Sequence, residues 1–173
     1  MSKIQLTSKF SFNANTIPSA AWALIEIIKD KDLFNAVRAE ASNAFDLDPM
    51  SQKKRLNIKQ LVELPLLQSI YTECLRMHVS INFTRGITDN YTLGGYALKK
   101  GSLIQAPTMV AHFDPTIWDE PEHPASEFWA GRHLKDIEEV DKSGVKRTVT
   151  KFSITGRSGG FFPFGRMLEN PQV

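Results

Sequence analysis

The chain has little cysteine, little net charge and no long apolar run near its amino terminus. Its one cysteine, Cys74, excludes an internal disulfide and a Cys-rich zinc site. The start of the sequence has no apolar run of the length that a signal peptide or a membrane span needs. Lysine and arginine number 21 against 19 acidic residues, and the basic residues are scattered apart from Lys53-Lys54-Arg55. We therefore expect no transmembrane segment in this chain and no nucleic-acid partner.

What the chain does contain is sufficient for one domain. Apolar residues make up 42% of its 173 residues and aromatic residues 10%, which indicates a sizeable core rather than disorder. Four histidines are present, but none of them has the i, i+4 pairing of a helical metal site. The sequence therefore predicts no metal site among these histidines, which are His78, His112, His123 and His133.

The apolar spacing predicts helices in the first half of the chain. Apolar residues recur at i, i+4, i+7, i+8 and i+11 from Ile17, which indicates a helix to about Lys29. Asp32 is placed to cap a short second helix. Residues 45–57 are expected to form a loop, and residues 58–63 one or two helical turns. Another helix should begin at Pro65, because proline is tolerated in the first turn.

The pattern changes after His78. Short β-prone pieces at residues 83–88, 91–93 and 103–106 indicate a small antiparallel sheet. Residues 108–113 could form a helical turn, and the proline-rich residues 114–124 should be irregular. The fold class expected is mainly α with a small antiparallel β-sheet (α+β).

Glu73 and Arg76 are spaced i, i+3 on the helix after Pro65. Two opposite charges at that spacing can bond side by side, opposite the apolar stripe that carries Cys74. Taken alone, such a pair is a solvated surface ion pair worth roughly 0.2 to 0.5 kcal/mol.

The neighbours of this pair change its interpretation. They follow one another in a fixed order: Leu64-Pro65-Leu66-Leu67, Glu73-Cys74-Leu75-Arg76, Arg85, Gly94-Gly95-Tyr96 to Gly101, Ala111-His112-Phe113-Asp114-Pro115, Trp118, and Phe128-Trp129-Ala130-Gly131-Arg132. This order resembles the cytochrome P450 family of haem-thiolate monooxygenases. The resemblance covers the chain from about Phe10 to Gly165, and it implies a single partial domain, residues 1–173, with an incomplete cytochrome P450 fold.

The resemblance implies roles for several residues. Glu73, Arg76 and Arg132 would form a fold-defining cluster, in which a planar guanidinium can bond a carboxylate bidentately where lysine cannot. Arg85 falls where many members place a partner of the haem propionate, and the alternative is an exposed strand arginine.

Thr16 matches the oxygen-groove threonine of the family, where its hydroxyl would help to deliver protons. Pro18 has no backbone N–H, so in a continuous helix the carbonyl of Ala14 would lose its partner and a kink would open. The alternative is that Thr16 caps a helix beginning at Ile17. Asn15 stands where most members carry an acid, and an amide cannot relay a proton as a carboxylic acid does.

The run Asn15-Thr16-Ile17-Pro18 resembles the subgroup that contains sterol side-chain-region hydroxylases and prostacyclin synthase. It implies a small hydrophobic substrate that is lipid- or sterol-like, and a choice between hydroxylation and isomerisation stays open.

Near the end of the chain, residues 160–165 look like the start of the cysteine loop of the family, with Phe164 and Gly165 beside the haem. The match stops between Gly165 and Arg166, and the expected ligating cysteine does not follow. Cys74 cannot substitute, because it lies on an apolar stripe where free cysteines are usually core. Haem is thus expected only from the family, and this chain should not support monooxygenation as written.

The family also implies a flavoprotein reductase as electron donor and a place at the cytosolic face of the endoplasmic reticulum membrane, although no anchor is evident in this chain. A non-catalytic fragment is the main alternative, because half a fold leaves apolar helix faces exposed. The run Gly156-Arg157-Ser158-Gly159-Gly160 matches the nucleophile elbow of serine hydrolases. No histidine follows Ser158, however, so a hydrolase is a remote alternative.

Overall fold

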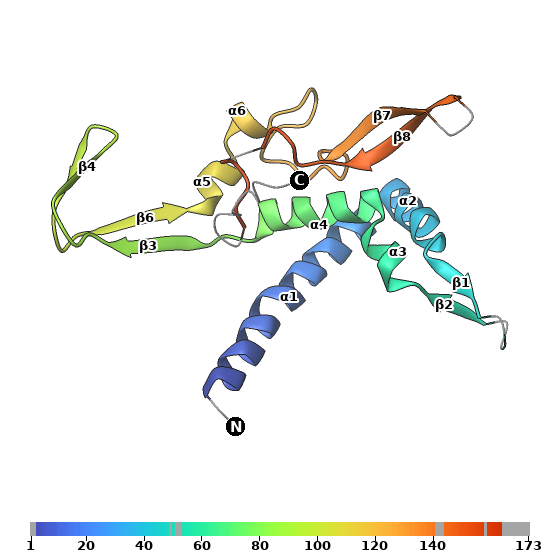
Figure 1. Ribbon diagram of the computed structural model, residues 1–173, viewed down its shortest axis with the longest axis horizontal. Helices are drawn as coiled ribbons and strands as arrows, with labels where there is room; N and C mark the ends of the chain where they lie inside the picture. Colours follow the sequence, from blue (N-terminus) through green and yellow to red (C-terminus); the bar gives the residue numbers. More distant parts are fainter. Residues whose placement is uncertain (1–2, 49, 51–52, 141–143, 158, 164–173) are drawn as a thin grey trace.

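The computed structural model describes residues 3–48, 50, 53–140, 144–157 and 159–163, and for residues 3–15 it describes the backbone alone. In these residues the chain forms helices and two-stranded antiparallel sheets around one central helix, which agrees with the expected α+β class (Figure 1). The helices are α1 (Lys3–Lys29), α2 (Lys31–Ser42), α3 (Ile58–Val62), α4 (Pro65–His78), α5 (Thr108–His112) and α6 (Pro115–Trp118). The strands are β1 (Phe45–Leu47), β2 (Lys54–Leu56), β3 (Asn82–Gly86), β4 (Tyr91–Leu93), β5 (Tyr96–Leu98), β6 (Leu103–Pro107), β7 (Leu134–Val140) and β8 (Lys146–Phe152).

Helix α1 begins earlier than its apolar spacing predicted. It runs from Lys3 through Pro18 to Lys29, so a start at Ile17 is wrong. Thr16 consequently lies inside a continuous helix and is not an N-cap. Pro18 cannot donate a hydrogen bond to the carbonyl of Ala14, which is the local condition that the oxygen-groove interpretation requires.

The two helices that follow differ from the predictions only in detail. Asp30, not Asp32, caps α2, because its carboxylate accepts hydrogen bonds from the backbone N–H groups of Asp32 and Leu33 at 2.8 and 3.0 Å. The expected loop after α2 contains the hairpin of β1 and β2, and this part of the prediction is wrong. Helix α3 lies within the predicted helical residues 58–63.

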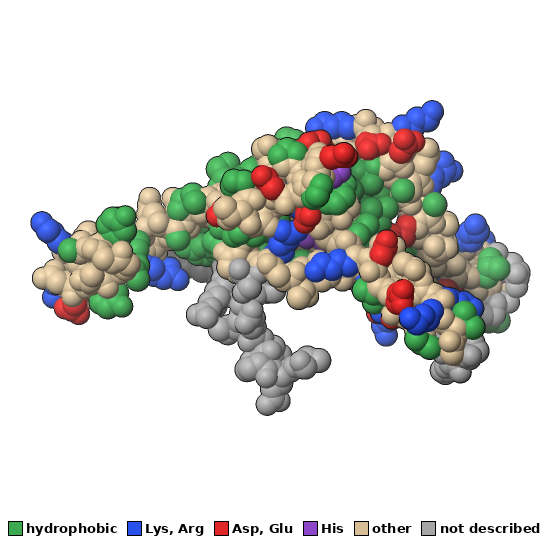
Figure 2. All heavy atoms as spheres, turned by 90° about the horizontal axis from the view of Figure 1, so that it is seen from above, with side chains coloured by type: hydrophobic (Ala, Val, Ile, Leu, Met, Phe, Trp, Pro, Cys, Tyr) green, Lys and Arg blue, Asp and Glu red, His purple; other side chains and the backbone are tan. Residues whose placement is uncertain are grey.

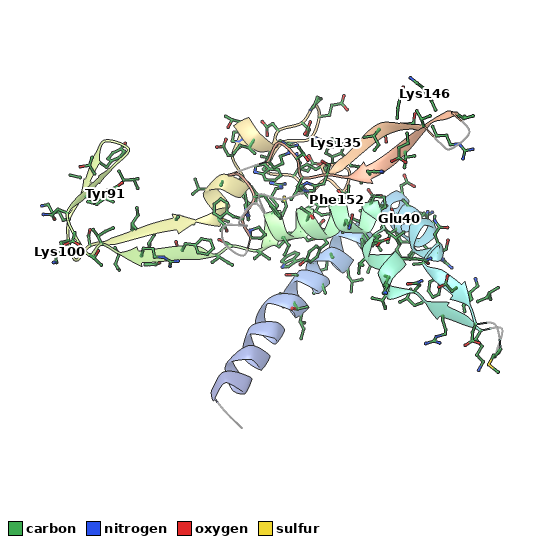
Figure 3. All side chains as sticks on the ribbon, viewed as in Figure 1. Glu40, Tyr91, Lys100, Lys135, Lys146 and Phe152 are labelled. Atoms are coloured by element: carbon green, nitrogen blue, oxygen red, sulfur yellow. The ribbon has the colours of Figure 1, made fainter. Side chains whose placement is uncertain are left out.

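Helix α4 begins at Pro65 as predicted, but its N-terminal cap comes from another helix. Leu64, at the N-cap position, has no side-chain acceptor. The carboxylate of Glu40 on α2 accepts instead from the backbone N–H groups of Leu66 at 2.8 Å and Leu67 at 3.1 Å. Figure 3 shows Glu40 beside the beginning of α4. A negative charge near the N-terminus also interacts favourably with the helix dipole. Glu40 therefore links α2 to α4 through these hydrogen bonds.

Two antiparallel ribbons extend from the centre. Strand β3 pairs with β6, from Asn82 opposite Pro107 to Gly86 opposite Leu103, and the β4–β5 hairpin follows at its far end (Figure 1). The turn between β4 and β5 uses Gly94 and Gly95 at φ values of 56° and 86°, the left-handed region that a tight hairpin needs. The predicted strands are confirmed, but they form separate two-stranded ladders and not one sheet.

The second ribbon was not predicted from its charged sequence. Strands β7 and β8 pair in register from Leu134 opposite Phe152 to Val140 opposite Lys146. Figure 3 labels Lys146 near the outer end and Phe152 near the end that meets α4. Part of the stretch expected to be irregular is also ordered, because Asp114 caps α6 through the N–H of Thr116 at 2.9 Å.

The apolar core is small and centres on α4. Ile27 from α1 packs with Ile70 and Cys74 from α4, and partly buried side chains surround them. Elsewhere apolar side chains reach the surface, including those on the ribbon that carries β4 and β5 (Figure 2). In the described part of the chain, no helix combines the length and the apolar character that crossing a bilayer requires.

Candidate functional site

A cluster of buried charged side chains surrounds Glu73. The guanidinium of Arg76 donates to both carboxylate oxygens of Glu73, from Nε to Oε2 at 2.9 Å and from Nη2 to Oε1 at 2.7 Å. Nε of Arg132 donates to Oε1 at 2.8 Å. All three side chains have no exposed surface. The structure thus brings together the three residues that the sequence grouped, and we name them the Glu-Arg-Arg cluster.

Two further groups form hydrogen bonds to the Glu73 carboxylate. The backbone N–H of Trp129 lies 3.3 Å from Oε1, and Nε2 of His133 lies 3.2 Å from Oε2. His133 follows Arg132 directly and is 1% exposed. Because the carboxylate oxygen accepts, Nε2 of His133 carries the proton in this contact.

The same two arginines hold an irregular segment by its backbone. Their other N–H groups donate to carbonyl oxygens from the end of α5 to the residues before β7: from Arg76 to His112, Ala125 and Glu127, and from Arg132 to Trp118, His123, Pro124 and Glu127. A buried carbonyl without a donor costs free energy, so this arrangement stabilises a segment that has few ladder bonds of its own.

Aromatic rings enclose the guanidinium groups. Trp118 is fully buried, and its ring centroid lies 5.3 Å from the Arg76 guanidinium. The ring of Phe113 lies 5.5 Å from the same group, and that of Trp129 lies 5.7 Å from Arg132. These cation–π contacts replace part of the hydration that the buried cations lose.

The electrostatics of the cluster favour an ionised Glu73. Burial by itself would raise the pKa of Glu73, but hydrogen bonds from Arg76 and His133, together with the Arg76 charge, lower that pKa to about 2. The carboxylate is therefore charged over the whole physiological range and serves as a fixed acceptor, not as an acid or base.

The spacing of Glu73 and Arg76 brings the two side chains together as expected, but they do not form the surface ion pair that the spacing indicates when taken alone, because both are buried. Most of the second half of α4 is buried, including the face that was expected to meet water. The cause is tertiary, because the residues that cover this face lie about 40 to 60 positions further along the chain. Among the residues of α4, all of which the structure describes, only Tyr71 is exposed.

The two residues expected at the oxygen side lie on α1. Thr16 is exposed, and Asn15 precedes it in the same helix, its side chain lying outside the described residues. Neither belongs to the Glu-Arg-Arg cluster, and their role stays a prediction. Phe164 and Gly165, expected beside the haem, also lie outside the described residues.

Arg85 lies on β3 opposite Ile104 of β6. Its side chain is exposed, and Nη1 donates to the carbonyl of Thr84 at 3.0 Å. The strand position and the exposure agree with both interpretations of this residue, a carboxylate partner and a plain strand arginine.

Cys74 does not have the properties of an iron ligand. It is 1% exposed in the core, and burial, with the charges of Glu26 and Glu73, raises the pKa of its thiol to about 12. A thiol in that state is protonated, whereas iron binds the thiolate. His112 and His133 already use ring nitrogens within the fold. None of these three residues is therefore available as an axial ligand, and Arg85 is the described residue for which a contact with haem stays a prediction. Among these residues there is also no group of three side chains that could hold a metal ion.

Two histidines at the site were not identified from the sequence. His133 contacts Glu73, and His112 lies fully buried between α4 and residues 159–163. The available indications were that His112 stands in the quoted run Ala111-His112-Phe113-Asp114-Pro115 and that His133 directly follows Arg132.

Comparison with known proteins supports the same family. The family model described as Cytochrome P450 matches residues 13–166. A cytochrome P450 monooxygenase (calL) of Penicillium decumbens is 45% identical over 90% of this chain and 27% of the relative. A cytochrome P450 monooxygenase (efuG) of Hormonema carpetanum is 32% identical over 92% of this chain and 32% of its own length. A cholesterol 7-alpha-monooxygenase of Cricetulus griseus is 30% identical, over 94% of this chain and 32% of its own length. The chain thus spans about a third of the length of these relatives.

Proposed function

Because the chain belongs to the cytochrome P450 family, we propose that it forms part of a haem-dependent monooxygenase that acts on a lipid- or sterol-like substrate. The observation that carries the proposal is the buried Glu-Arg-Arg cluster. Its geometry joins α4 to the segment that leads into β7, and the motifs of the family occur on both sides of it in order. The 173 residues are one partial domain of that enzyme.

The substrate class rests on two observations. The run Asn15-Thr16-Ile17-Pro18 lies within α1 and matches the sterol-hydroxylase subgroup. A relative that covers nearly the whole chain is named a cholesterol monooxygenase. Both favour a small hydrophobic substrate over a charged one.

The proposed roles of the residues follow from their chemistry. Haem, when bound, supplies the activation of dioxygen. The hydroxyl of Thr16 would donate a proton at its Oγ, and the amide of Asn15 would hold water by hydrogen bonds without titrating. Arg85 would bind a propionate carboxylate through its guanidinium. Phe164 and Gly165 would lie against the porphyrin. The Glu-Arg-Arg cluster would position these elements and take no part in the chemistry.

Two further expectations accompany the proposal. Electrons would come from a flavoprotein reductase, and the enzyme would lie at the cytosolic face of the endoplasmic reticulum membrane. Both rest on membership of the family.

By itself, the 173-residue polypeptide should bind no haem through a thiolate, because Cys74 is buried and protonated. The test is to add haem to the purified chain, reduce it and add carbon monoxide. We expect no absorption band of the thiolate-ligated complex. Appearance of that band in the wild-type chain, and its loss in Cys74→Ser, would contradict the assignment of Cys74 to the core.

A second measurement separates the monooxygenase from a non-catalytic chain. Sequencing the transcript beyond Val173 should reveal a glycine-rich continuation that contains a cysteine. A stop codon directly after Val173, without a cysteine in any spliced form, would overturn the monooxygenase and leave a non-catalytic polypeptide.

A further inference from the structure

His112 lies fully buried between the end of α4 and residues 159–163. Its Nδ1 is 3.1 Å from the backbone carbonyl of Arg76, and its Nε2 is 3.3 Å from the backbone N–H of Phe162. The ring therefore contacts the backbone of two segments that lie more than 80 residues apart in the sequence.

These two contacts determine the protonation state of the ring. The carbonyl of Arg76 can only accept, so Nδ1 must carry a proton. The backbone N–H of Phe162 can only donate, so Nε2 must present its lone pair. Both bonds exist together only in the neutral tautomer protonated at Nδ1.

We propose that His112 is a positioning residue. In its neutral Nδ1–H tautomer it donates to the carbonyl of Arg76 and accepts from the backbone N–H of Phe162, and so it sets where the chain lies just before the residues assigned to the haem. The residues assigned to the haem, Phe164 and Gly165, follow Phe162 in the sequence after Pro163. The consequence for haem rests on the proposed function, whereas the bridge between Arg76 and Phe162 does not.

The surroundings hold the ring in this position. The carbonyl of His112 accepts from Nη1 of Arg76 at 2.7 Å, so the Glu-Arg-Arg cluster fixes the backbone of His112 as well. The rings of Phe161 and Phe162 both lie 5.6 Å from the imidazole, the first stacked and the second edge-on. The ring of Phe83 from β3 lies 6.3 Å from that of Phe162. Loop residues are thus packed on the histidine as well as bonded to it.

Burial and one charged neighbour oppose protonation of His112. Burial lowers its pKa, and the Arg76 cation on α4 lowers it further, while the bond to the Arg76 carbonyl acts in the opposite direction. The other titratable groups nearby are Glu73, which forms an ion pair with the same Arg76, and His133, whose ring contacts that of Phe161. A proton added to Nε2 would place two donors face to face, so the bond to Phe162 would break.

The test measures the amide hydrogen of Phe162 by exchange in the full chain, with rates corrected for the intrinsic effect of pH. We expect its protection to fall roughly tenfold or more once acid protonates Nε2 of His112, as the imidazole ¹⁵N shifts would show, because one hydrogen bond is lost. The amide of Val79, bonded to the carbonyl of Leu75 on α4, is the internal reference and should stay constant.

Two variants and one spectrum complete the experiment. His112→Gln can still accept from Phe162 but does not titrate, so its protection should no longer depend on pH. His112→Leu should lose the protection at every pH. The imidazole ¹⁵N shifts of the wild type report the tautomer directly, even where a variant fails to fold. A proton on Nε2 at neutral pH, or a protection of Phe162 that stays unchanged while the ¹⁵N shifts show that Nε2 has been protonated, would overturn the proposal. None of these readouts requires haem, so a failed bridge and a failed monooxygenase are distinguishable.

Discussion

The guanidinium of Arg76 meets the carboxylate of Glu73 through two parallel hydrogen bonds, at 2.7 and 2.9 Å, with both side chains closed off from solvent. The two residues are one helical turn apart, which on an exposed helix would make a weak pair. Burial reverses that expectation, because removing either partner leaves an uncompensated charge in the interior.

Glu73→Gln should therefore destabilise the chain strongly. We expect a loss of about 3 to 5 kcal/mol in the free energy of unfolding, since Arg76 and Arg132 would both remain buried and lose their anion. Urea denaturation followed by circular dichroism measures this loss. Glu138→Gln is the matched control: Glu138 pairs with Lys146 at 3.0 Å, but both side chains are largely exposed. It should cost less than about 1 kcal/mol. Equal losses in the two variants would mean that burial does not strengthen the cluster.

The Glu73 carboxylate should also make the free energy of unfolding depend on pH in the acidic range. The pKa of Glu73 is about 2 in the fold, below its ordinary value of 4.5. Its contribution is therefore complete above pH 4.5 and is lost as pH falls toward 2. The urea midpoint of the wild type should fall as pH decreases over this window. The difference in urea midpoint between the wild type and Glu73→Gln should therefore become smaller. A gap that stays constant down to the acid limit would contradict the lowered pKa.

Glu40→Gln should weaken the start of α4. The carboxylate accepts from two N–H groups, of Leu66 and Leu67, so the variant should lose about 1 kcal/mol of stability. Thermal unfolding measures the difference. Glu63→Gln removes an exposed carboxylate close to the same helix end and is the control for charge alone. If both variants shift the melting temperature equally, the hydrogen bonds from α4 do not matter.

Cys74 should be unreactive in the folded chain. Its thiol is buried and its pKa is raised to about 12, so little thiolate exists at neutral pH. Iodoacetamide at about pH 8 should leave the native chain unmodified and alkylate it fully in urea, as mass spectrometry would detect. Because the chain has one cysteine, the denatured sample is its own positive control. Rapid alkylation without urea would place Cys74 outside the core.

Local signals in the sequence predicted a large part of the fold. Pro65 marked the beginning of α4, and the glycine pair at residues 94–95 marked the β4–β5 turn. The ribbon of β7 and β8 was missed because its residues are mostly charged or polar on both faces, without the apolar alternation that identifies a half-buried strand. The early part of α1 was missed because Pro18 reads equally well as a first-turn residue.

The site was predictable in its members but not in its environment. The spacing of Glu73 and Arg76 is visible in the sequence, whereas the burial of both depends on carbonyls and rings supplied by residues 112–133. Sequence spacing contains no information on such long-range contacts, and the family resemblance was needed to connect Arg132 with them. His112 was named only as part of a family motif, and neither it nor His133 was given a role beyond the exclusion of metal ligation.

The partners of Glu73 leave the ribosome at different times. Arg76 follows after three residues, but Arg132 follows only after 59. During synthesis, α4 therefore leaves the ribosome with both Glu73 and Arg76 present. Both side chains must stay hydrated until the β3–β6 ribbon and the segment beyond it have been synthesised. Closing so long a loop costs entropy before any contact compensates for it. The buried cluster that holds the finished molecule together should consequently form late, and a nascent chain that stalls before Arg132 is a natural substrate for chaperones.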